Sequence, residues 1–281
     1  MSDKSVPIQR AAHKVLEPLH TMVYFVPEAG EHYTAAGISN GRSGYFASRS
    51  AAMGVVPAEV VISTFYNFSP GLVRKAIPSC WESSTPEAIL KARYAAVDAA
   101  WTRLLGEAEL KSDEMAEAAA LGREACSAIE DEIVGRPLYA GHASLPWPEP
   151  AHLQLWHAAT LLREHRGDGH IAALILSGLS GLEASVTYIA YGSAFNEELQ
   201  RKTRGYSEEE WAQTKVDLQR QGIFDDTNQF TEQGRKQREE IEAQTDVAAA
   251  TPYEHLGDER TQRLIELVRP WARSISKQIF G

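Results

Sequence analysis

The chain has 281 residues, of which 43% are hydrophobic and 23% are charged, a composition that excludes collagen-like and wholly disordered chains. No stretch approaches the ~18 consecutive apolar residues of a membrane-spanning helix. The N-terminal residues Met1 to Ser5 lack the apolar core of a secretory signal, and two cysteines are too few for a disulfide framework or a cysteine zinc site. These features predict a cytoplasmic protein with no membrane partner.

The charge balance limits the partners of the protein. The 38 Asp and Glu residues exceed the 28 Lys and Arg residues, which gives a formal net charge of -10. An acidic chain is repelled by the phosphates of nucleic acid at long range. DNA binding would therefore need a local basic patch, and the overall charge counts against it.

Helical signals dominate the chain. Thr85-Pro86-Glu87 is a helix start, because a capping hydroxyl precedes a proline at the first helical position. Ser207 and Glu210 have the spacing of a capping box, which predicts a second helix start. Between them, four prolines within residues 136–150 predict a linker.

The two halves of the chain share an internal pattern. Residues 49–53 align with residues 170–174, and the same offset aligns the helix start at 85–87 with that at 206–208. A third match, later in both halves, needs one insertion. This pattern predicts a duplication with a first repeat at residues 1–135, a proline-rich linker at 136–150 and a second repeat at 151–281.

The second half contains a pattern typical of a winged helix. An apolar pair, a polar turn at residues 225–228 and a return through Phe230-Thr231 predict a small β-hairpin between two helices. Gly222-Ile223 before the turn and residues 230–234 after it resemble the corresponding positions of MarR-like winged helix-turn-helix proteins.

The chain as a whole resembles an actinobacterial family of tandem MarR-like winged helix-turn-helix proteins, whose functions are largely unassigned. The resemblance rests on His20, residues 65–68, residues 162–170 and Thr245-Asp246. It implies a mostly α fold, in which tandem winged-helix repeats with short β-hairpin wings form a pseudo-dimer within one chain. Such a chain would be a monomer or would pair as a homodimer.

The helix before the wing would be the recognition helix of such a fold. Residues 207–221 carry four acidic and two basic residues, and three of the acidic residues are in the first turn. The turn at 225–228 also lacks the arginine that commonly enters the minor groove. DNA is therefore a partner that the sequence permits but disfavours.

The densest polar cluster lies at residues 163–170, where Gly167 and Gly169 are expected to break the helix and gather polar side chains at a kink. A histidine next to a carboxylate is the usual arrangement for acid–base catalysis, which gives four candidate catalytic residues: His20, His165, Asp168 and His170. Their spacing fits neither a zincin nor a zinc finger, so no metal site is predicted. The structural alternative is an ion pair between Arg166 and Asp168, with His170 as a buried, hydrogen-bonded histidine.

Aromatic residues with a few polar groups predict a small-molecule pocket. The candidate ligand-binding residues come from both halves of the chain: Tyr24, Arg49, Phe65, Tyr66, Asn67, Arg166, Glu183 and Tyr188. We expect one largely apolar cavity to be lined by His20, Tyr66, Asn67, Arg166 and His170. Ordinary core packing, with the tyrosine hydroxyls reaching solvent, is the alternative.

The sequence contains no nucleophile motif, phosphate-binding loop or dinucleotide fingerprint, and it indicates no particular cofactor. The favoured function is binding of a small molecule, aromatic or polyketide-like, between the repeats. One alternative is an enzyme that uses His and Asp acid–base chemistry on the bound molecule. A second alternative is a ligand-responsive, DNA-binding transcriptional regulator.

Overall fold

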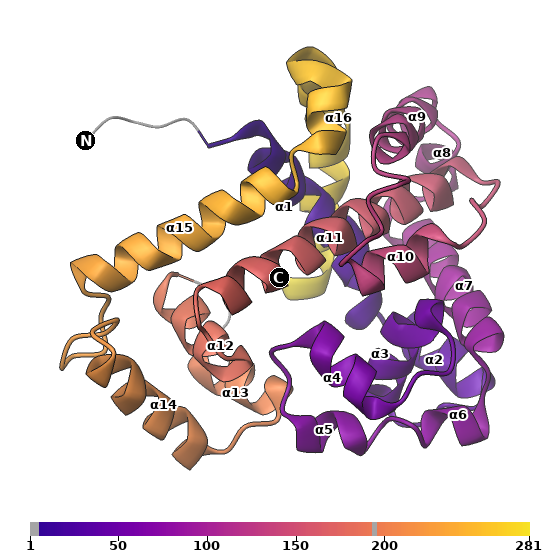
Figure 1. The fold of residues 1–281 in the computed structure, drawn as a ribbon. Helices are drawn as coiled ribbons and strands as arrows, with labels where there is room; N and C mark the ends of the chain where they lie inside the picture. The colour runs from indigo at the N-terminus through magenta and orange to yellow at the C-terminus, as the bar shows by residue number, and fades with distance from the viewer. Residues whose placement is uncertain (1–5, 193–195) are drawn as a thin grey trace.

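The computed structural model describes residues 6–192 and 196–281, and over those ranges the chain is mostly helical (Figure 1). The first part of the chain forms α1 (Ile8–Thr21), η1 (Met22–Tyr24), α2 (Pro27–Ala35), α3 (Gly41–Ser50), η2 (Ala51–Met53), α4 (Ala58–Phe65), α5 (Pro70–Arg74), α6 (Cys80–Ser83), α7 (Pro86–Leu105), α8 (Glu107–Leu110), α9 (Asp113–Ser127) and α10 (Pro137–Ala143). The second part forms α11 (Ala151–Leu176), α12 (Gly181–Ala190), α13 (Glu197–Arg204), α14 (Glu208–Arg220), α15 (Glu232–Ala248) and α16 (Thr251–Phe280).

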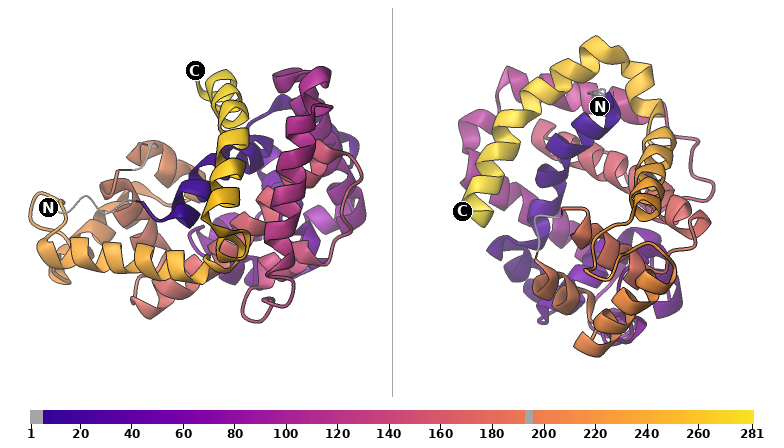
Figure 2. Two further views of the ribbon diagram at one scale, coloured as in Figure 1. Left: turned by 90° about the horizontal axis from the view of Figure 1, so that it is seen from above. Right: turned by 90° about the vertical axis from the view of Figure 1, so that its left-hand side faces the viewer.

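Four helices form the centre of the fold. α1 packs on α11 and α16, and α9 packs on the same two helices; α16 passes α1 in the right-hand view of Figure 2. The apolar side chains between these helices are buried, among them Leu16, Leu19, Leu155, Leu264 and Val268. The packing joins the beginning of the chain to its end, because the first helix lies against the last one.

A second, smaller core lies beneath α12, α14 and the C-terminal half of α11. Its buried members include Trp211, Leu218, Phe224 and Ile241. α13 and α14 are joined by a three-residue turn, residues 205–207, which begins with Gly205 at a positive φ of 79°. Two helices joined by a short turn with glycine are the arrangement of a helix-turn-helix, and we call residues 196–231 the HTH unit.

Both capped helix starts predicted from the sequence are confirmed. The Thr85 hydroxyl accepts the backbone N–H of Ala88 at 3.2 Å at the start of α7. At the start of α14, the Ser207 hydroxyl accepts the Glu210 N–H at 3.1 Å, and the Glu210 carboxylate accepts the Ser207 N–H at 2.7 Å. These signals are local, so the sequence is sufficient to locate them.

The segment at residues 136–150, predicted as a linker, contains α10. Pro137 occupies the first turn of this helix, where its missing N–H costs nothing. Leu138 and Tyr139 are buried, and their backbone N–H groups donate to the Asp168 carboxylate at 3.1 and 2.9 Å. The segment is therefore packed against α11 instead of forming an extended connector over its whole length.

The predicted helix break at Gly167 and Gly169 is wrong, because α11 continues without interruption from Ala151 to Leu176. Gly169 instead permits close packing: a Cβ atom there would lie 2.8 Å from the Cβ of Ala248 and 3.1 Å from Arg136. Because the helix is unbroken, the polar residues at 163–170 point to different sides of α11 and do not meet at a kink.

The wing is smaller than a β-hairpin with two strands. Within the two described ranges, strand pairing is limited to a single antiparallel bridge between Phe224 and Phe230. The Asp225 carboxylate accepts the backbone N–H groups of Thr227 and Gln229 at 2.8 and 3.0 Å and closes the turn between the two phenylalanines. Thr231 then caps α15.

In the described ranges, no single helix has both the length and the apolar composition to cross a membrane; α11 and α12 meet these criteria only together, as a pair bent by 102°.

Gly169→Ala should lower the free energy of unfolding by ~1–3 kcal/mol, because the new methyl group overlaps Ala248. Gly167→Ala is the matched control, since a Cβ atom there meets only the carboxylate of Glu164, at an ordinary contact distance of 3.6 Å. It should raise stability by about 0.5–1 kcal/mol through helix propensity. Urea unfolding of both variants checks the pair, and equal effects at the two positions would contradict close packing at Gly169.

Candidate functional site

Glu164 is the centre of a buried polar network between α1, α3 and α11. Its side chain is 1% exposed. Arg163 donates to it at 2.7 Å and Arg49 at 3.1 Å, and Arg163 also donates to Glu17 at 2.9 Å. Burial alone would raise the pKa of Glu164, but Arg49 and Arg163 lower it well below its usual value. The carboxylate is therefore ionised and binds two cations.

His20 is a neutral histidine with both ring nitrogens occupied. The Thr160 hydroxyl donates to the backbone carbonyl of Trp156 at 3.0 Å. The bond of 2.9 Å between His20 Nδ1 and Thr160 Oγ1 therefore carries the proton of Nδ1, and Nε2 accepts from the Tyr24 hydroxyl at 2.9 Å. Burial lowers the pKa of His20 well below its usual value, with Arg163 and Arg93 adding to the effect.

Three aromatic rings connect two arginines near this network. Arg93 lies over Tyr24 with its guanidinium carbon 5.4 Å from the ring centroid, and the rings of Tyr24 and Tyr45 are 4.9 Å apart. The ring centroids of Tyr45 and Phe68 are 5.5 Å apart, and the guanidinium carbon of Arg204 lies 4.4 Å from the centroid of Phe68. We call these five residues the arginine–aromatic stack.

Arg49 joins this stack to the ion-pair network. It donates to the Tyr45 hydroxyl at 3.3 Å and lies 4.3 Å over the ring of Phe65. Its other contact is Glu164, as described above. Because Arg49 is 12% exposed and Arg163 is 21% exposed, this side of the network has limited access to solvent.

The two arginines at the ends of the stack have no carboxylate partner among the described residues. The Nε–H group of each is buried without an acceptor. Arg93 is 0% exposed, and its hydrogen bonds to Tyr24 and Ser48 are long, at 3.3 and 3.4 Å. Arg204 is partly exposed, and burial, with Arg49 and Arg163 contributing, lowers its pKa.

A strained turn at Tyr66 places two phenylalanines on the same side of the chain. Tyr66 has φ 56° and ψ -55°, and the Asn67 N–H donates to the Phe65 carbonyl at 2.6 Å. These are the features of a γ-turn with positive φ, a conformation that is rare outside glycine. The Tyr66 hydroxyl donates to the Leu179 carbonyl. As a result, Phe65 and Phe68 both contact Tyr45.

The sequence-predicted cavity is not formed by its five residues. His20 belongs to the network on α1, whereas His170 Nδ1 bonds Thr245 at 2.8 Å and Arg166 pairs with Glu242 at 3.4 Å, on the side of α11 that faces α15. Tyr66 and Asn67 form the γ-turn. The structure does bring together four of the predicted residues: His20, Tyr24, Arg49 and Phe65.

The other predicted residues have separate local roles. His165 bonds Glu132 at 2.8 Å, and Asp168 caps α10, so the two do not form an acid–base pair with each other. Burial raises the pKa of Asp168 to about 6 and lowers that of His170 to about 3. Glu183 completes the capping box of α12, and Tyr188 is 41% exposed on that helix.

Arg93 and Arg204 were not among the site residues predicted from the sequence. Arg93 stands four residues after Ile89 and four before Val97, on the buried face of α7, so helical periodicity alone would have placed a charge in the core. Arg204 gives no such signal, because its burial depends on Phe68 from a distant part of the chain.

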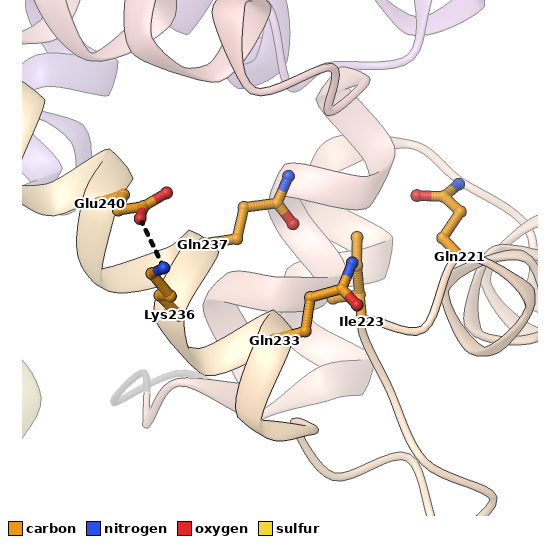
Figure 3. A pocket seen from close by; sticks show the side chains of 6 residues that line it. All are labelled: Gln221, Ile223, Gln233, Lys236, Gln237 and Glu240. Carbon is orange, nitrogen blue, oxygen red and sulfur yellow. Dashed lines mark ion pairs between the residues drawn. The ribbon is translucent and has the colours of Figure 1, made fainter.

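Two surface hollows lie outside this site. The larger, of about 390 Å³, opens between the end of α14 and α15 (Figure 3) and is lined by Gln221, Ile223, Gln233, Lys236, Gln237 and Glu240. The smaller, of about 200 Å³, lies between α8, α9 and α16. Among the described residues, no group of three or more His, Cys, Asp or Glu side chains is placed to hold a metal ion.

The fold and the HTH unit define a helix-turn-helix protein. A family model described as a helix-turn-helix family matches residues 9–280, and the chain belongs to that family. Searches of curated proteins and of solved structures found no match to the chain.

Glu164→Gln should lower the free energy of unfolding by about 3–5 kcal/mol, because it leaves Arg49 and Arg163 buried without their shared carboxylate. Glu59→Gln removes the carboxylate of an exposed pair with Arg74 and should change stability little. Urea unfolding measures both effects. A small loss in the Glu164 variant would mean that the network is not a structural requirement.

Proposed function

We propose that the protein binds a small anionic molecule at the arginine–aromatic stack. The observation that carries this proposal is the pair of guanidiniums, Arg93 and Arg204, that lie on aromatic rings without a carboxylate partner. A buried charge that lacks a partner is costly. An anion that entered beside Arg49, Arg163 and Arg204 would supply the missing partner, and the rings would pack against its apolar part.

Arg204 connects the proposed site to the HTH unit. Arg204 is the last residue of α13, and its carbonyl accepts the N–H of Ser69, next to Phe68, at 2.9 Å. Gly205 lies against Leu72 so closely that a Cβ atom would be 2.8 Å away. A ligand on the stack would therefore touch the HTH unit and the first part of the chain together.

We also propose that the scaffold is a duplicated, MarR-like winged-helix pseudo-dimer with repeats at residues 1–135 and 151–281. Reciprocal packing supports it: the first helix of the proposed first repeat, α1, packs on the last helix of the second, and the first helix of the second, α11, packs on α9 of the first. A two-fold arrangement produces this exchange.

We further propose that the protein is a cytoplasmic monomer or homodimer and that its ligand is aromatic or polyketide-like.

An enzyme is the less favoured alternative. His20, the one candidate catalytic histidine at the stack, has both nitrogens occupied by Thr160 and Tyr24, so it has no free nitrogen with which to move a proton on a ligand.

Phe68→Leu should weaken binding of an aromatic anion such as benzoate or phenyl phosphate by about tenfold, because it removes the ring beneath Arg204. Phe46→Leu is the matched control: Phe46 is equally buried and contacts Phe65 and Phe68, but carries no guanidinium. Both variants should lose ~1 kcal/mol of stability. Calorimetric titration separates them, and equal affinity in the two variants would count against the stack as the binding site.

DNA-dependent regulation is a second candidate function, supported by the HTH unit and by the family. The charges of that unit oppose it. Residues 196–231 carry eight Asp and Glu against five Lys and Arg. The fifth basic residue, Arg204, lies on Phe68. The other four are paired with acidic residues: Arg201 with Glu208, Lys202 with Glu198, Lys215 with Glu197 and Arg220 with Asp217.

We therefore expect no sequence-specific DNA binding at physiological salt, with or without ligand, in fluorescence anisotropy with the protein's own promoter fragment. A variant with Glu208, Glu209 and Glu210 all changed to Lys should gain salt-sensitive, non-specific binding. A specific complex of the unchanged protein that survives physiological salt would favour the regulator.

A further inference from the structure

The side chains around the stack carry more positive than negative charge. Arg49 and Arg163 are balanced by Glu164 and Glu17, to which they donate hydrogen bonds. Arg93 and Arg204 have no such partner among the described residues. The network and the stack together therefore hold four guanidiniums and two carboxylates, an excess of two positive charges.

The four guanidiniums act on two neighbouring tyrosines of the stack, Tyr24 and Tyr45. Burial raises the pKa of Tyr24, and Arg93, Arg163 and Arg49 each oppose that rise. Arg49 and Arg163 also act on Arg204. Tyr24 therefore lies in the field of Arg93, Arg49 and Arg163, and the neighbouring Tyr45 lies in the field of Arg49, Arg163 and Arg204.

The neighbouring histidines leave this excess unchanged. His20 is neutral because its pKa is far below its usual value. His142 is 2% exposed, and burial, with a contribution from Arg93, lowers its pKa to about 3. Neither histidine adds charge near neutral pH, and neither carries a negative charge that could offset Arg93.

We propose that the ligand of this site is a dianion, with two negative charges on one compact group such as a phosphate monoester or a pair of adjacent carboxylates. This inference rests on the proposed function. The group meets the partly exposed guanidiniums of Arg49, Arg163 and Arg204, whose N–H groups form paired bonds to oxyanions. Arg93 lies behind Tyr24 without access to solvent, so it contributes through its field and not by contact.

The test compares ligands that differ only in charge, at about pH 8, where a phosphate monoester is a dianion. One pair is phenyl phosphate and its monoanionic methyl ester, and the other is phthalate and benzoate. In calorimetric titrations with the unchanged protein, the dianion of at least one pair should bind tighter by about tenfold or more. The pair with the larger ratio of dianion affinity to monoanion affinity identifies phosphate or dicarboxylate as the source of the charge.

Two variants locate the effect. Arg204→Gln should bring the dianion-to-monoanion ratio close to one, whereas Lys202→Gln, the same change of charge on the exposed side of α13, should leave the ratio unchanged. The comparison in the unchanged protein remains decisive if the Arg204 variant is unstable.

Equal or tighter binding of both monoanions would overturn the inference and leave the proposed function in place. Absence of binding for all four compounds would count against the proposed function itself. A ratio that falls equally in the Lys202 variant would overturn the assignment to this site, because general surface charge would then explain it.

Discussion

The buried carboxylate of Glu164 is the group on which the centre of the molecule depends. It allows Arg49 of α3 and Arg163 of α11 to lie in the interior, since each finds there a partner of opposite charge. Arg163 extends the connection to Glu17 of α1. Three helices that are distant in sequence are thereby held in one orientation by directional bonds, in addition to the apolar contacts around them. Apolar packing alone would tolerate small rotations of these helices, whereas paired guanidinium bonds fix their register.

This ionic centre explains why the aromatic residues nearby form a stack instead of an ordinary core. Arg49 cannot move away from Glu164, and its position over Phe65 orients that ring. The γ-turn at Tyr66 then returns the chain so that Phe68 also contacts Tyr45. The strain of that turn is maintained because Tyr66 is held at its hydroxyl by Leu179 and its carbonyl faces Gly181, where any side chain would collide.

Local signals in the sequence were sufficient to predict much of the fold. Features that depend on residues distant in the sequence could not be predicted. The helix starts at Thr85 and Ser207 depend on residues three positions away, so they are legible in the sequence. Gly169 gave a misleading signal. A glycine is needed at this position because Ala248 of α15 packs against it, and no local pattern identifies that neighbour. The same distinction holds for the site: His20, Tyr24, Arg49 and Phe65 were identified as an unusual set of polar and aromatic residues. Glu164 lay inside a segment that was recognised, but its partners could not be assigned, and Arg204 is brought to Phe68 only by the tertiary fold.

The continuity of α11 has a mechanical consequence. Its 26 residues form a rod of roughly 39 Å at 1.5 Å per residue. The first half of the rod belongs to the central core through Leu155 and Trp156, and its last turns belong to the second core through Ala173 and Leu174. Because no hinge interrupts it, a tilt imposed on one half displaces the other half by a proportional amount. A rotation of α11 about its ionic contact at Glu164 would therefore displace the second core, which includes Trp211 of the HTH unit and lies at the C-terminal end of the helix.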